Sequence, residues 1–308
     1  MSFIRRLKKW SAEDWILNII ITITLLFLVI VTVYPFWNTV AISFNDGLDS
    51  IKGGITVWPR KWTGQNYASL FVDSRLLKAF GISVSRTIIQ TILSVFCTTM
   101  LAYSLSRKEF VLKKWLTSIL VISMYVNAGL IPNYMLIKKL HLINNYLVYI
   151  VPYIVDVFNF IIVRTYINGL PDSFVESARI DGANEFTIYM RIIMPLIVPV
   201  IAMICLFVAV GAWNNWFDTY LYASPKVNLH SLQYKLMEFL NSSQNQSTNA
   251  ADANAMAVAA AGGSSSSMVT PISIRASITI IATVPILVVY PFLQKYFVVG
   301  MTIGGVKE

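Results

Sequence analysis

Charged and aromatic residues inside strongly apolar segments are the first feature of this sequence with chemical consequences. Arg86, Asp156 and Arg275 lie in or near such segments, where an ionisable group is costly and marks a functional hypothesis. Because such groups commonly pair, Asp156 is expected either to pair with Arg86 or to line the pathway of a substrate, and Asn159 is expected to line the same pathway. Arg275, near the end of its segment, is expected to extend its head group towards water.

A second group, between 213 and 218, combines aromatic rings with amides and a carboxylate. Aromatic faces beside hydrogen-bonding side chains suit the binding of a carbohydrate, since an aromatic residue offers a broad apolar surface. The alternative is anchoring at a membrane interface together with hydrogen bonds between helices. The members of this group are Trp213, Asn214, Asn215, Trp216 and Asp218.

The remaining reactive residue types form no catalytic or metal-binding pattern. His141 and His230 have no ligand-spaced partner, and Cys97 and Cys205 lie in apolar runs, where small buried residues are usual. A phosphate-binding GxxxxGK[ST] loop is missing from the sequence, so any ATP and magnesium must be bound by another chain. The chain is therefore expected to be no enzyme and to carry no cofactor.

Six apolar segments must position these residues. The sequence is 56% hydrophobic and 13% charged, whereas soluble proteins carry about 25% charged residues. Segments of about 20 apolar residues span a bilayer, and the first, from about Ile16 to Phe36, is longer than the core of a signal peptide. We predict an all-α integral membrane protein with spans at about 15–41, 79–104, 115–137, 146–167, 195–222 and 273–297.

Lysine and arginine set the expected orientation. They are about twice as dense in the loops on the side of both termini as in the opposite loops, so both termini are expected in the cytoplasm. The net charge of +9 is explained by this topology rather than by binding to nucleic acid.

The expected divisions of the chain are a basic segment 1–14, a six-span domain 15–300 with an outer loop 223–272, and a tail 301–308. Residues 1–10 are expected either to lie as a short amphipathic segment at the membrane interface or to form a solvated basic tail. Residues 250–261, within a low-complexity stretch, are alanine-rich enough to be expected to form a short helix.

The loop 169–194 has an ordered helical pattern. Ser173, with Glu176 three residues later, predicts a capping box at the start of a helix over 174–180. Gly182, after Asp181, is expected to end that helix in a left-handed turn. A second helix is expected from Ala183, with Pro195 disfavouring helix at the preceding residue. An ordered helical hairpin on the cytoplasmic side, with apolar and charged residues together, indicates a docking surface.

These residues resemble the hallmark of permeases of binding-protein-dependent ABC importers. The hallmark reads Glu-Ala-Ala, three residues, Gly, nine residues, Ile, one residue, Leu-Pro; Ser and Met replace one Ala and the Leu here. Asp181-Gly182-Ala183, Trp213-Asn214 and the end from Tyr290 to Glu308 resemble the maltose-type branch, in the subgroup for polysaccharide or complex oligosaccharide uptake. The positions of the hallmark are occupied here by Glu176, Ser177, Ala178, Gly182, Ile192, Met194 and Pro195.

The resemblance implies a six-helix type I importer domain in a bacterial plasma membrane. It implies a homologous second permease, a cytosolic ATPase dimer that receives the coupling helix in 172–194, and an extracellular lipoprotein that delivers an oligosaccharide. The outer loop is expected to contact that lipoprotein. The alternative is a proton-coupled secondary transporter using Asp156; internal repeats and interrupted helices are expected of that class, and neither is evident in the sequence.

Overall fold

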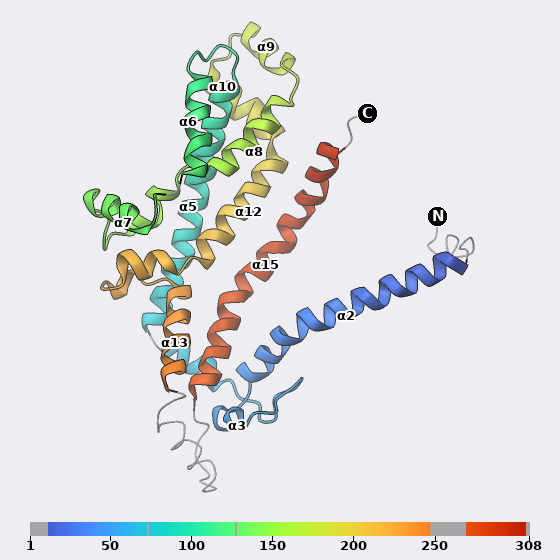
Figure 1. Ribbon diagram of the computed structural model, residues 1–308, viewed down its shortest axis with the longest axis vertical. Helices are drawn as coiled ribbons and strands as arrows, with labels where there is room; N and C mark the ends of the chain where they lie inside the picture. The colour runs from blue at the N-terminus through green and yellow to red at the C-terminus, as the bar shows by residue number, and fades with distance from the viewer. Residues whose placement is uncertain (1–11, 73, 127, 247–268, 306–308) are drawn as a thin grey trace. The chain divides into compact units, whose positions relative to one another are not determined.

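The apolar segments form helices in the computed structural model, which describes residues 12–72, 74–126, 128–246 and 269–305. The described chain divides into two units, one containing residues up to Val72 together with 242–281, and the other containing 73–241 together with the chain from Ala282 onwards. Its described residues contain no β-strand, only an isolated antiparallel bridge between Asn45 and Trp62. The all-α prediction is confirmed (Figure 1).

The first unit contains the long helix α2 (Ala12–Ser43) with two short helices, α3 (Gly47–Ile51) and α4 (Gln65–Val72). The apolar span of α2 has its side chains exposed along its length, as a helix surrounded by lipid requires. Asn66 donates hydrogen bonds to the carbonyls of Ser43 and Asn45 at 2.9 and 2.8 Å. These contacts fix the chain where it leaves the first span.

The second unit is built around α5 (Ser74–Ser106), against which α8 (Val157–Asn168) and α12 (Val198–Asn214) pack. Further helices of this unit are α6 (Lys113–Tyr125), α7 (Leu130–Lys139), α9 (Ser173–Ile180), α10 (Glu185–Ile188) and α11 (Met194–Leu196). Helix α13 (Leu232–Gln246) lies in the predicted outer loop, and α15 (Pro271–Gly305) is the last described helix. Short 3-10 turns occupy Tyr146–Tyr149, Val151–Tyr153 and Val227–Leu229, and π turns occupy Tyr189–Ile193 and Thr219–Ala223.

Three helices are long and apolar enough to cross a membrane alone: Trp15–Ser43, Ser74–Ser106 and Pro271–Pro291. Two bent pairs raise the number to five if each is one span: Tyr146–Tyr153 with Val157–Asn168, bent by 42°, and Glu185–Leu196 with Val198–Asn214, bent by 84°. The prediction of a continuous span over 115–137 is wrong, because α6 ends at Tyr125 and α7 begins at Leu130. Gly129, with a φ of 87°, precedes α7 in a conformation that a helix interior does not allow.

The span predicted over 195–222 is also interrupted. Met194 is helical, contrary to the expectation from Pro195, because a π turn over 189–193 leads into a short helix that accepts proline in its first turn. The sharp bend comes later, at Ile197. Interrupted helices are therefore present, contrary to the expectation, and helix continuity does not distinguish this chain from a secondary transporter.

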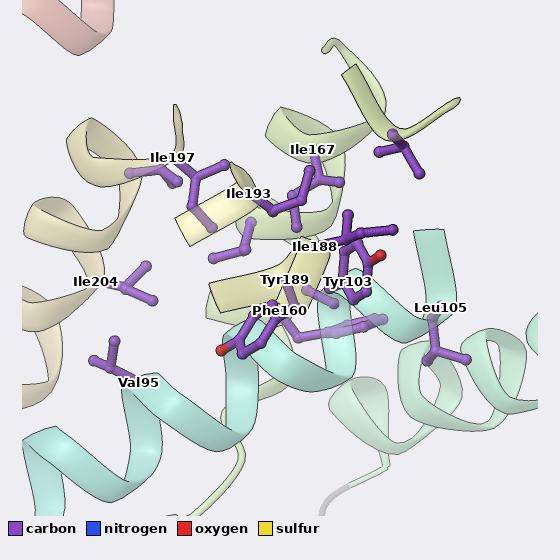
Figure 2. Packing of buried hydrophobic residues seen from close by; sticks show 14 of the residues in the cluster. Val95, Tyr103, Leu105, Phe160, Ile167, Ile188, Tyr189, Ile193, Ile197 and Ile204 are labelled. Atoms are coloured by element: carbon purple, nitrogen blue, oxygen red, sulfur yellow. The ribbon is translucent and has the colours of Figure 1, made fainter. Parts of the chain in front are cut away.

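The core of the second unit joins the C-terminal half of α5 to α8 and to the bent segment 185–204 (Figure 2). Tyr189 is 1% exposed, and its hydroxyl lies 2.8 Å from the hydroxyl of Thr99 on α5. Its ring packs 5.5 Å, between centroids, from the ring of Tyr103. The π turn thus places a large aromatic side chain in the core and holds α9 and α10 at one end of α5.

Candidate functional site

Helix α9 ends in a tight turn that its own backbone closes. Gly182 has a φ of +82°, and its amide donates to the carbonyl of Arg179 while the amide of Ala183 donates to that of Ala178, both at 3.0 Å. This is a Schellman motif, which requires the left-handed conformation that glycine adopts without strain. The predicted turn at Asp181-Gly182 is confirmed.

The start of α9 differs from the prediction. Ser173 is the first helical residue and Asp172 precedes it in a helical conformation, without a side-chain cap. The predicted capping box is therefore wrong, because capping needs an extended residue ahead of the helix. A side-chain cap occurs instead at the next helix, where Asn184 accepts a hydrogen bond from the amide of Thr187 at 2.8 Å.

The hallmark residues divide between the core and the surface. Ala178 is buried, and Ala183 and Ile192 pack against the same core. Glu176, Ser177, Asp181, Gly182 and Pro195 face outwards. The most exposed apolar residue on this turn is Ile180, at 87%, followed by Phe186 at 60%. Since both side chains are mainly exposed, they form an apolar tip on an ordered turn.

An ionic network, which the sequence did not reveal, ties α9 to the turn between α5 and α6. Arg179 pairs with Glu109 of that turn and, at 2.8 Å, with Glu185 of α10. Lys108 pairs with Asp172, and the hydroxyl of Tyr103 donates to Glu185 at 2.6 Å. The partners are largely exposed, so each pair alone contributes little, but together they link three segments.

The network is expected to persist through the physiological pH range. A hydrogen bond from Arg179 lowers the pKa of Glu109 from 4.5 to about 2, and one from Lys108 lowers the pKa of Asp172. A carboxylate with a lowered pKa stabilises the folded state above its ordinary pKa, and that contribution disappears as the pH falls towards the lowered value. We therefore expect proteolytic protection of the 169–194 loop to be constant between about pH 5 and 8 and to fall only in stronger acid. Loss of protection near neutral pH would contradict this prediction.

Substitution of Gly182 should act through the backbone alone. A Cβ at this position would have no atom within 4 Å, so Gly182→Ala costs about 1–2 kcal/mol through the left-handed φ. Gly182→Asn is the matched control, since asparagine tolerates this conformation better. Thermal unfolding of the purified variants should rank wild type above Asn and Asn above Ala. Equal melting temperatures for Asn and Ala would contradict the strain argument.

A cavity of about 530 Å³ lies between α5, the bend before α8, and α12. Asp156, Asn159 and Asn215, three of the predicted pathway residues, line it, and so do Gln90 and Tyr153. Asp156 precedes α8 and caps it by accepting a hydrogen bond from the amide of Asn159 at 2.7 Å. The expected pairing of Asp156 with Arg86 is wrong.

Arg86 instead pairs with Asp218, and both side chains are almost completely buried. Its guanidinium also donates to the carbonyl of Asn215 at 3.0 Å and lies 4.5 Å from the centroid of the Tyr149 ring. Asp218 accepts a further hydrogen bond from Tyr153 at 2.8 Å. This pair, 132 residues apart in sequence, fixes the end of α12 to α5 beside the cavity.

The other residues of the 213–218 group lie outside the cavity lining. Trp213 is 6% exposed and donates to the carbonyl of Ala282 at 2.8 Å, so its indole is a packing element of the second unit. The amide oxygen of Asn214 accepts a hydrogen bond from Gln233. Trp216 lines a separate hollow with Tyr220 and Tyr234. Asp156, Asn159 and Asn215 thus lie together in the cavity lining. Asp218 is not part of the lining, but it accepts hydrogen bonds from the lining residues Tyr153 and Asn215.

Comparison with known proteins identifies the family. Residues 2–303 match the sequence pattern of the family described as binding-protein-dependent transport system inner membrane component. The chain is 34% identical over 277 residues to Protein LplC of Bacillus subtilis, covering 90% of each chain. It is 30% identical over 283 residues to the polygalacturonan/rhamnogalacturonan transport system permease protein YtcP of the same species, covering 92% of this chain and 95% of YtcP.

The fold agrees with this assignment. A chain in the crystal structure of a bacterial ABC transporter involved in the import of the acidic polysaccharide alginate superposes with a TM-score of 0.82. The match covers 94% of this chain and 99% of that chain at 24% identity. Secondary transport receives no support from these matches. The chain belongs to the family of inner membrane components of binding-protein-dependent transport systems, as a permease subunit of an ABC importer.

Proposed function

We propose that this permease subunit imports an oligosaccharide, forming half of a translocation pathway with a homologous second permease. A cytosolic ATPase dimer, which binds ATP and magnesium, drives the cycle, and an extracellular lipoprotein delivers the sugar. The substrate class is supported by the names of relatives, among them arabinooligosaccharide and galactooligosaccharide permeases of Bacillus subtilis. A binding-protein partner and an ATPase partner are inherent in this family.

The 172–194 loop is proposed as the element that docks into the ATPase. One observation carries this assignment: Ile180 is 87% exposed at the tip of a turn that a Schellman motif and an ionic network hold rigid. Exposed apolar side chains on an ordered turn, rimmed by charges, are typical of a protein interface. The turn after α5 and the start of α6 lie at the same end of α5 and are basic, with Arg107, Lys108, Lys113 and Lys114. This supports a cytoplasmic position for the loop and for both termini.

The cavity beside α8 is proposed as a section of the sugar pathway. Asp156, Asn159 and Asn215 supply polar groups to it, and Phe158 and Phe207 supply aromatic surface. Trp216 is proposed as a separate aromatic contact near α13. Trp213, Asn214 and Asp218 act as supporting residues, because their polar groups bond within the chain.

Co-purification tests this function. The chain is tagged, extracted gently from its native membrane, and its companions are identified by mass spectrometry. An ATPase, a second permease and a lipoprotein are expected, and the sugar retained by that lipoprotein identifies the substrate. Purification of the chain alone, from membranes that contain all components, would contradict the importer assembly. Retention of a ligand other than a carbohydrate would contradict the substrate class alone.

A further inference from the structure

The cavity beside α8 carries one formal negative charge. Asp156 is the sole residue with a carboxylate or cationic side chain among the described residues that line it. Its neighbours in the lining are amides, aromatic residues and small residues, including Gln90, Asn159 and Phe158. A ligand in this cavity therefore meets one carboxylate and no cationic side chain in the described lining.

The nearest buried cation does not offset that charge. Both terminal nitrogens of Arg86 are bonded, one to Asp218 and the other to the carbonyl of Asn215. Tyr153 and Asn215 belong to the cavity lining, and both also donate hydrogen bonds to Asp218 behind it. The ion pair is thus neutral as a unit and is separated from the cavity by its own hydrogen-bond partners.

Two amide side chains in the cavity lining can form further hydrogen bonds with a polar ligand. Gln90 and Asn159 are 6% and 5% exposed, and their carbonyl oxygens have no hydrogen-bond partner among the described residues. Leaving a buried acceptor unpaired is unfavourable, and a glutamine or asparagine amide rotates over a broad range about its last torsion. After such a rotation, each amide oxygen can accept a hydrogen bond from a different hydroxyl group of a ligand in the cavity. Phe158 and Phe207, 52% and 42% exposed, offer apolar surface for the carbon face of a sugar ring.

We propose that this cavity is a subsite for a neutral, hydroxyl-rich segment of the sugar, and that Asp156 discriminates against uronates. A sugar hydroxyl can donate a hydrogen bond to Asp156, whereas a uronate carboxylate only accepts and carries the same charge. The low dielectric of a protein interior strengthens that repulsion relative to water. The inference rests on the pathway role proposed above, and the names of relatives do not imply it, since polygalacturonan and alginate are acidic polymers.

Cysteine labelling of the assembled transporter in lipid tests the charge directly, without reference to the specificity of the binding protein. Cys97 and Cys205 are replaced by serine, and Val208→Cys places a thiol in the cavity lining. Cationic and anionic methanethiosulfonate reagents of similar size are compared, each corrected for its rate with a free thiol. We expect the cationic reagent to react severalfold faster. Asp156→Asn should remove the preference, and Asp156→Lys should reverse it.

Control variants distinguish loss of the charge from loss of the helix cap, and a wrong charge assignment from a wrong pathway assignment. Asn caps helices as well as Asp does, so Asp156→Asn keeps the start of α8 while removing the charge. Val72→Cys, at a position 85% exposed on α4, should show a reagent ratio that Asp156→Asn leaves unchanged. Equal corrected rates of the two reagents at Val208→Cys would overturn charge discrimination by Asp156, but would not contradict the pathway role of the cavity. Failure of both reagents to label Val208→Cys, with or without ATP turnover, while Val72→Cys reacts, would overturn the pathway role itself.

Discussion

Ile180→Asp is expected to abolish ATP-driven uptake while the chain remains folded and inserted. Ile180 is 87% exposed within the chain, so the substitution leaves the permease core untouched. If the side chain is buried in an ATPase cleft, a charge there removes apolar contact and desolvates a carboxylate. Central interface residues cost about 2 kcal/mol or more when lost, which corresponds to an ATPase association weaker by about thirtyfold or more. Quantitative co-purification and uptake measure the effect.

The matched control is Val72→Asp, an equally drastic change at an 85% exposed apolar residue of α4. This residue lies in the first outer loop of the predicted topology and should retain the ATPase. Equal melting temperatures for both variants exclude misfolding as the cause. If Ile180→Asp retains the ATPase and full uptake, α9 is not the docking element, and the assignment of the 172–194 loop is wrong.

Arg86→Met is expected to be the most destabilising single substitution in the second unit. It leaves the carboxylate of Asp218, which is 3% exposed, without its cation. Removing one partner of a buried ion pair typically costs about 3–5 kcal/mol. Low membrane abundance and a lowered melting temperature in lipid nanodiscs should follow. Purified protein with the melting temperature of the wild type would show that the pair does not stabilise the fold.

The double variant Arg86→Met with Asp218→Leu distinguishes a missing contact from an unpaired charge. Replacing both partners of a buried pair with apolar residues is often neutral, so the double variant should recover much of the stability lost in Arg86→Met. Full recovery is not expected, because Tyr153 and Asn215 also lose their acceptor. A double variant less stable than Arg86→Met would show that the hydrogen bonds to Asp218 matter more than its charge.

Local sequence determined the features whose physical causes are local. Long apolar runs predicted α2, α5 and α15, since a span is defined by its own composition and length. Gly182 predicted the turn after α9 because only its neighbours and its φ are involved. The hallmark spacing in 176–195 indicated the family, which the match over residues 2–303 shows.

Tertiary structure decided which distant groups meet. The sequence suggested Asp156 as the partner of Arg86, whereas the folded chain brings Arg86 of α5 to Asp218, which follows α12. The same packing leaves Asp156 to cap α8 and to line the cavity. Arg179 meets Glu109 across 70 residues, a contact that no local pattern encodes. The gap between α6 and α7 and the bend at Ile197 were not anticipated either, since an apolar composition alone favours a continuous helix.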